Sequence, residues 1–230
     1  MAQRHRGTRS KHKGNEPDDV FVEKVLHLGK WAEANQQLLT ILIVVIAIGV
    51  LGMVYYRNYR ANLNLQAASE LEQIYQSISI NDTEGARTQL ATFLERSAGT
   101  PFEAEARLLL GELYLKDDSP EQAEAVLRPV GEAPRRPIEF QAAMLLGAAL
   151  EEDGEWDDAI QVYLGIADRS ELDFQVRDAL QAAARIRRDQ GDLDGAITLY
   201  QRLLDGLDEA DPQRGQYQMR IEEIETARQA

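Results

Sequence analysis

Cysteine is absent from the 230-residue sequence, and histidine occurs only three times. The lack of cysteine excludes disulfide bonds, thiolate chemistry and a lipid-modified N-terminal cysteine. His5, His12 and His27 all precede residue 28, so the rest of the chain has no imidazole for catalysis or for zinc. Its acidic clusters do not follow the calcium-loop pattern with a terminal Glu. We therefore expect no enzymatic activity, no catalytic residue, no cofactor and no metal site.

Positive charge is scarce beyond the N-terminal region, and the whole chain has a formal net charge of −14. Residues 1–37 carry a net charge of +2, so residues 38–230 carry −16, and Lys116 is the only lysine among them. So acidic a body argues against nucleic acid or anionic lipid as its partner.

Charged residues are missing altogether from Leu38 to Tyr56, where twelve of the 19 residues are Leu, Ile or Val. A helix of this length reaches roughly 28 Å, close to the thickness of about 30 Å of a bilayer's hydrocarbon core. The twelve residues favour insertion by about 4 to 7 kcal/mol in total. A cleaved signal peptide has a shorter apolar region nearer the N-terminus. We interpret residues 38–56 as a retained transmembrane helix, and a buried core helix is the alternative.

The residues around this stretch predict its orientation. Seven Lys and Arg residues precede it, and only Arg57 and Arg60 follow closely. This asymmetry places the N-terminus in the cytoplasm and residues 57–230 outside it. Residues 1–17 are basic and are expected to be disordered, whereas residues 18–37 are expected to form an amphipathic juxtamembrane helix. The reverse orientation, with cytoplasmic repeats, is the alternative that contradicts the charges.

A repeat with a period of 36 to 37 residues occupies most of the remaining chain. Ala123, Ala159 and Ala196 begin similar short motifs, and a small residue lies twelve positions before each of them. A large residue follows four positions after each: Leu127, Tyr163 and Tyr200. Small residues allow two helices to cross closely, and the large residue fills the space that the crossing leaves. The pattern resembles the tetratricopeptide repeat, a unit of two antiparallel helices.

The resemblance predicts an all-α fold, with one N-terminal transmembrane helix followed by an α-solenoid. The long helix is expected to continue to about Ser79, because no Gly or Pro occurs from Met53 to Glu84. We place repeats at about 67–100, 104–137, 140–173 and 177–210, with Pro101, Pro137 and Pro212 between units. A helix at about 213–228 would close the stack with its polar face. A generic array of helical hairpins is the alternative.

In proteins with this repeat, the first helices line a concave groove. The resemblance maps this groove onto the following candidate partner-binding residues: Leu71, Tyr75, Ile78, Leu108, Glu112, Leu115, Met144, Ala148, Arg185 and Arg188. Lys116, Gln141, Glu151 and Gln181 occupy further groove positions. Met suits varied protein segments because its side chain adapts to many shapes. The alternative is that the preceding long helix or the closing helix fills the groove.

The combination of a single span with such repeats resembles the membrane-anchored bacterial family that includes the ancillary subunit of the Sec translocon. The segments Phe21–Val25 and Trp31–Ala32, together with the helix around Leu71, carry this resemblance. It implies a protein-binding adaptor at the periplasmic face of the inner membrane, with translocon subunits, secreted clients or periplasmic chaperones as partners. A structural scaffold subunit of a fixed envelope complex is the alternative.

Overall fold

The computed structural model describes residue 33 and residues 35–229, and every regular element in that part of the chain is a helix. The all-α expectation is therefore confirmed. The chain divides into two compact units, residues 1–60 and 61–230. The expected disordered tail at 1–17 and nearly all of the expected juxtamembrane helix at 18–37 lie outside the described residues.

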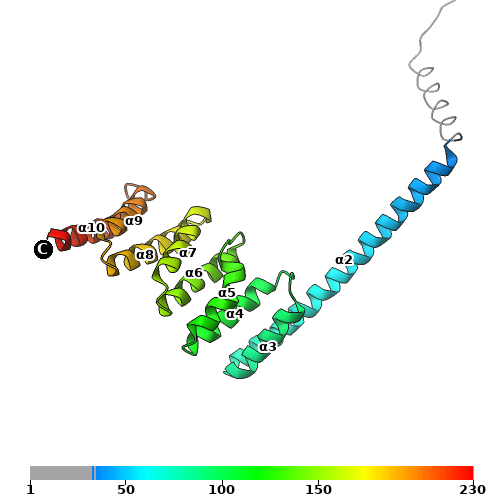
Figure 1. The fold of residues 1–230 in the computed structure, drawn as a ribbon, viewed down its shortest axis with the longest axis horizontal. Helices are drawn as coiled ribbons and strands as arrows, with labels where there is room; N and C mark the ends of the chain where they lie inside the picture. The colour runs from blue at the N-terminus through cyan, green and yellow to red at the C-terminus, as the bar shows by residue number, and fades with distance from the viewer. Residues whose placement is uncertain (1–32, 34, 230) are drawn as a thin grey trace, which may run out of the picture. The chain divides into compact units, whose positions relative to one another are not determined.

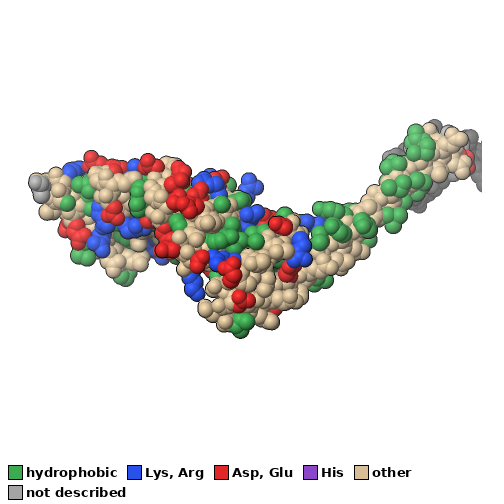
Figure 2. Space-filling model, turned by 60° about the horizontal axis from the view of Figure 1, so that its bottom comes forward, with side chains coloured by type: hydrophobic (Ala, Val, Ile, Leu, Met, Phe, Trp, Pro, Cys, Tyr) green, Lys and Arg blue, Asp and Glu red, His purple; other side chains and the backbone are tan. Residues whose placement is uncertain are grey.

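Within the first unit, the long helix α2 (Gln36–Ser79) begins just before the apolar stretch. Apolar side chains in the first half of α2 are exposed to about half or more of their surface, among them Ile43, Ile48 and Leu51. Figure 2 shows hydrophobic side chains on the surface of this helix. The hydroxyl of Thr40, near the start of the helix, donates to the carbonyl of Gln36 at 2.8 Å, so it is satisfied locally. Among the described helices, α2 alone is long and apolar enough to cross a membrane.

The second unit begins within α2 and continues through eight further helices in the described residues (Figure 1). Their bounds are α3 (Thr83–Arg96), α4 (Glu103–Lys116), α5 (Pro120–Gly131), α6 (Pro137–Glu152), α7 (Trp156–Arg169), α8 (Asp173–Asp189), α9 (Leu193–Asp205) and α10 (Arg214–Gln229). Each helix from α3 to α9 packs on the next one in the chain, and α4 also packs on α6. This is the arrangement of stacked helical hairpins.

Two clusters of buried side chains form the core of this unit. The first joins residues 67–74 of α2 to α3 and α4, and the second runs from Leu108 through α5 to α10. Helix α4 contributes to both, with Leu110 in the first cluster and Leu108 in the second, while Tyr114 packs against both. Each hairpin buries its apolar face against its neighbours, and α4 is the helix that adjoins both clusters.

The close helix crossings occur at the small residues of the repeat. A Cβ atom placed on Gly111 would lie 2.7 Å from the side chain of Leu127, and one on Gly147 would lie 2.5 Å from Tyr163. The turns inside the hairpins use residues with positive φ, namely Asp118, Gly154 and Gly191. A left-handed residue at this point reverses the chain directly after a helix.

Two helices begin earlier than the expected units. Helix α6 begins at Pro137 and α8 at Asp173, whereas the repeat pattern placed the third and fourth units at 140 and 177. Pro137, expected between units, lies in the first turn of α6. An N–H group at this position has no carbonyl partner within the helix, so proline loses no hydrogen bond there, and its fixed φ suits a helix. Pro101 and Pro212 lie in turns outside the helices.

Candidate functional site

A central hollow of about 380 Å³ opens between the first helices of three successive hairpins. It is lined by residues of α4, α6 and α8: Leu108, Glu112, Phe140, Gln141, Met144, Leu145, Phe174, Gln175 and Asp178. Among the described residues, neither α2 nor α10 contributes to this lining. The hollow is therefore not filled by the long helix or by the closing helix.

The floor of the central hollow is apolar and its rim is acidic. Phe140 lies one turn before the adjacent residues Met144 and Leu145 on α6. Glu112 of α4 and Asp178 of α8 contribute the carboxylates. Burial raises the pKa of Glu112 above its ordinary value. An apolar side chain of a partner would cover this floor and remove more of its surface from water.

Next to it, a terminal hollow of about 800 Å³ lies between α8 and α10, with Tyr200 of α9 at its base. Its lining is polar and includes three arginines, Arg185 and Arg188 of α8 and Arg220 of α10. Asp178 lines both hollows, so the two adjoin along α8.

Of the ten residues expected to form the groove, seven lie on α4, α6 and α8 and three on α2. Leu108, Glu112 and Met144 line the central hollow, and Arg185 and Arg188 line the terminal hollow. Leu115 and Ala148 are half-buried, and Leu115 packs against the second core cluster. The structure thus brings five of the expected residues into two adjoining hollows.

The expected groove residues of α2 have a different environment. Leu71 is only 3% exposed and belongs to the first core cluster, against which the half-buried Ile78 also packs. Tyr75 is 39% exposed, and its hydroxyl donates to Glu105 of α4 at 2.6 Å. Burial and this hydrogen bond raise the pKa of Tyr75 to about 12. Leu71 is unavailable to a partner because this face of α2 packs against α3 and α4.

The repeat pattern missed Phe140 and Phe174, the two aromatic side chains of the central hollow. Phe174 is 52% exposed although it lies in the first turn of α8. A fourth unit that begins at 177 leaves Phe174 outside the repeat. The signal available in the sequence is a phenylalanine at or just before the start of the first helices α4, α6 and α8, at Phe102, Phe140 and Phe174.

Arg185 also has a structural partner. Its Nη2 donates to Glu151 of α6 at 2.6 Å, and the same carboxylate accepts the hydroxyl of Tyr163 at 2.7 Å. Burial and then the hydrogen bond to Glu151 raise the pKa of Tyr163, which is 3% exposed. This network ties the hairpin α6–α7 to α8, so Arg185 serves the stack as well as the hollow.

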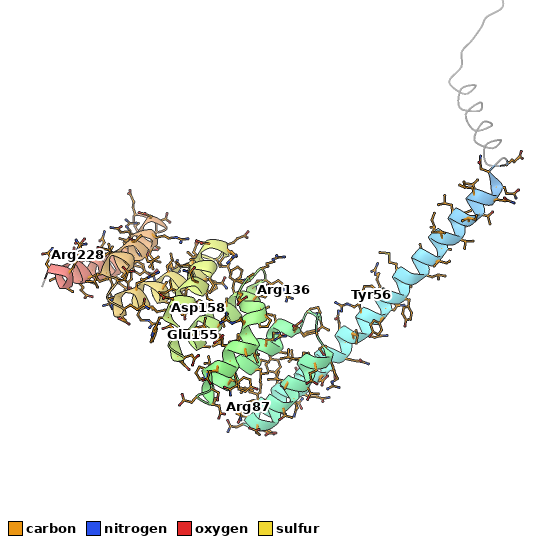
Figure 3. All side chains as sticks on the ribbon, in the orientation of Figure 1. Tyr56, Arg87, Arg136, Glu155, Asp158 and Arg228 are labelled. Atoms are coloured by element: carbon orange, nitrogen blue, oxygen red, sulfur yellow. The ribbon has the colours of Figure 1, made fainter. Side chains whose placement is uncertain are left out.

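A cluster of three carboxylates lies on α5 and in the turn between α6 and α7. Oxygen atoms of Glu124, Asp153 and Glu155 lie within 4.8 Å of one another, and the charge of Glu124 is the largest cause that raises the pKa of Glu155. Arg128 is hydrogen-bonded to Glu124 and lies 3.9 Å from Glu155. Glu155 directly precedes α7, Asp158 lies in its first turn, and both are exposed (Figure 3). We interpret this group as a surface ion-pair network.

Comparison with known families agrees with this architecture. The family described as tetratricopeptide repeat-like domain matches residues 29–226. The chain belongs to this family. Its domains are generally non-catalytic protein-interaction modules. The matched region begins before the apolar stretch, so the likeness to the family includes the apolar helix as well as the repeats. No curated protein matches the sequence significantly.

Proposed function

We propose that this chain is a single-span, non-enzymatic adaptor that holds protein segments at the outer face of a bacterial inner membrane. The observation that carries the proposal is the central hollow, an apolar surface on a family of interaction modules that no described segment of the chain covers. Exposed apolar side chains in a hollow favour a partner that buries them.

The apolar part of α2 supports the membrane anchor. Its side chains from Leu38 to Val54 are exposed all around the helix, and water is a poor solvent for so continuous an apolar surface. The side chain of Tyr56 projects outward at the end of this stretch, where aromatic rings favour the headgroup region (Figure 3). The excess of basic residues before the stretch supports a cytoplasmic N-terminus and a periplasmic repeat domain.

The partners we propose are translocon subunits, secreted client proteins or periplasmic chaperones. An extended or helical segment fits the hollow between three first helices, and its apolar side chains would contact Phe140, Met144 and Phe174. Phe174 is 52% exposed, and the flexible side chain of Met144 adapts to varied partners.

The test is crosslinking in intact cells from a photoreactive residue at Met144, read by mass spectrometry. The control is the same residue at Gln122, an exposed position of α5 outside both hollows. Capture of many secreted proteins with a translocon subunit from Met144, and not from Gln122, is the expected result. Absence of any Met144-specific product would overturn the proposal, and one stoichiometric partner would favour a scaffold subunit instead.

The orientation has its own test. Protease added to spheroplasts is expected to cleave the C-terminal domain, because the proposal places it outside the inner membrane. A C-terminus that resists protease until the membrane is dissolved would contradict the periplasmic assignment.

A further inference from the structure

The terminal hollow is a local exception to the charge of the body around it. Residues 61–230 contain 16 Lys and Arg against 34 Asp and Glu, so an acidic segment is repelled by most of this surface. The lining of the terminal hollow gathers three arginines beside Asp178 and Glu223, and the carboxylates of Glu151 and Asp189 pair with two of these arginines. The hollow therefore concentrates guanidinium groups on an otherwise acidic surface.

The arginines keep hydrogen-bond donors for a ligand. Arg188 uses Nε and Nη2 on the neighbouring Asp189, and Arg220 uses Nη1 on Glu223 at 2.9 Å. A guanidinium has five N–H donors in a planar fork that suits bidentate binding of a carboxylate. Both ion pairs are exposed and lie within one helix, and such pairs contribute little, so a ligand carboxylate exchanges for them at small cost.

The two hollows form one continuous surface along α8. Asp178 lines both, and the α8 residues Phe174, Asp178, Gln181, Arg185 and Arg188 run from the apolar hollow to the arginines. At about 1.5 Å per residue, Arg188 lies roughly 21 Å along the helix from Phe174. An extended chain covers that distance in about six residues.

We propose that this surface selects protein segments in which apolar side chains are followed, about six residues away, by Asp or Glu side chains. The apolar residues occupy the central hollow, and the carboxylates bind Arg188 and Arg220 in the terminal hollow. This specificity rests on the proposed adaptor function and names the chemical class of segment that it takes. A protein segment fits better than a lipid surface because the arginines adjoin an apolar hollow within a strongly acidic body.

The test uses the full chain in detergent micelles and fluorescent peptides with blocked termini, so that only side chains carry charge. One peptide has two aromatic residues followed about six residues later by two Glu, and its match has Gln in their place. Fluorescence anisotropy is expected to show about tenfold weaker binding of the Gln peptide, as for the loss of charge-assisted hydrogen bonds. Moving the Glu pair next to the aromatic residues is expected to lose most of this gain.

The variant R188Q/R220Q is expected to lose the preference for Glu without changing the affinity for the Gln peptide. Both arginines pair within their own helices, so the fold does not depend on them as it does on Arg185. The matched control R135Q/R169Q removes the same charge at exposed positions outside both hollows, and it is expected to keep the preference.

Three outcomes would overturn this inference. Equal binding of the two peptides, with Met144 still crosslinking clients in cells, would refute the acidic preference and leave the adaptor function standing. Failure of both peptides together with failure of the Met144 crosslink would refute the adaptor function itself. Binding of phosphatidylglycerol vesicles that requires Arg188 and Arg220, without binding of the Glu peptide, would assign the hollow to lipid headgroups.

Discussion

The contact between Gly147 and Tyr163 gives a quantitative test of the packing. A Cβ atom on Gly147 would lie 2.5 Å from ring carbons of Tyr163 and 2.9 Å from its hydroxyl oxygen. The substitution Gly147→Ala therefore displaces the ring, which is held by the hydrogen bond to Glu151. Overpacking costs about 1 to 3 kcal/mol, and loss of a buried hydrogen bond to a carboxylate costs about 1.5 to 3 kcal/mol.

Helix propensity acts in the opposite direction, because Ala favours a helix over Gly by about 1 kcal/mol. We therefore expect Gly147→Ala to lower the free energy of unfolding by about 1.5 to 5 kcal/mol. In a Tyr163→Val background, where neither the ring nor its hydroxyl remains, the same substitution is expected to be neutral or to stabilise by up to about 1 kcal/mol.

The assay is urea unfolding of the full chain in micelles, followed by far-ultraviolet circular dichroism. Gly215→Ala in α10 is the control, since a Cβ there meets no atom within 4 Å, and it is expected not to destabilise. An equal loss from Gly147→Ala in the native and Tyr163→Val backgrounds would refute the steric explanation. So would a native background that becomes more stable.

Three further predictions concern single groups. The pKa of Glu139 is lowered because hydrogen bonds from the N–H groups of Arg135 and Arg136 and from the Arg136 side chain outweigh its desolvation. Because its pKa is lowered, ionised Glu139 stabilises the fold at pH values above the ordinary Glu pKa of about 4.3. This stabilisation is lost as pH falls through the folded-state pKa. Glu139→Gln should therefore destabilise at neutral pH and converge with the native protein in acid, and a pH-independent difference in denaturation would contradict this. Asp192→Ala removes the acceptor for the N–H of Gly195 at 2.9 Å and should cost about 1 kcal/mol in urea unfolding, whereas no change would show that the cap is unimportant. Ile46→Lys should weaken membrane insertion by about 3 to 4 kcal/mol and increase alkaline extraction from membranes, and unchanged retention would argue against a span.

Local signals were enough to predict the helices and their turns. The apolar run from Leu38, the small residues at the crossings and the turn at Asp153–Gly154 depend on neighbours close in the chain, so they are legible without the structure. The positions of helix starts were less accurate, because Pro137 is equally at home between helices and in a first helical turn.

The candidate site was only partly predictable. The resemblance mapped Leu108 and Met144 onto one groove, and both line the central hollow. The repeat register could not predict that Leu71 is buried, because side chains of α3 and α4 cover it. Nor could it predict that Phe174 is exposed in the central hollow. The role of Arg185 in pairing with Glu151 of the preceding hairpin was equally invisible.

By itself, the sequence determined an acidic chain with one apolar helix, a helical repeat and no imidazole or thiol in the repeat domain, since composition and period are local properties. The tertiary structure alone decided which first-helix residues remain exposed and that the apolar and arginine-lined hollows adjoin along α8. The physical reason is that exposure and charge balance at a point depend on side chains from several hairpins, and their distances are fixed only when the hairpins pack.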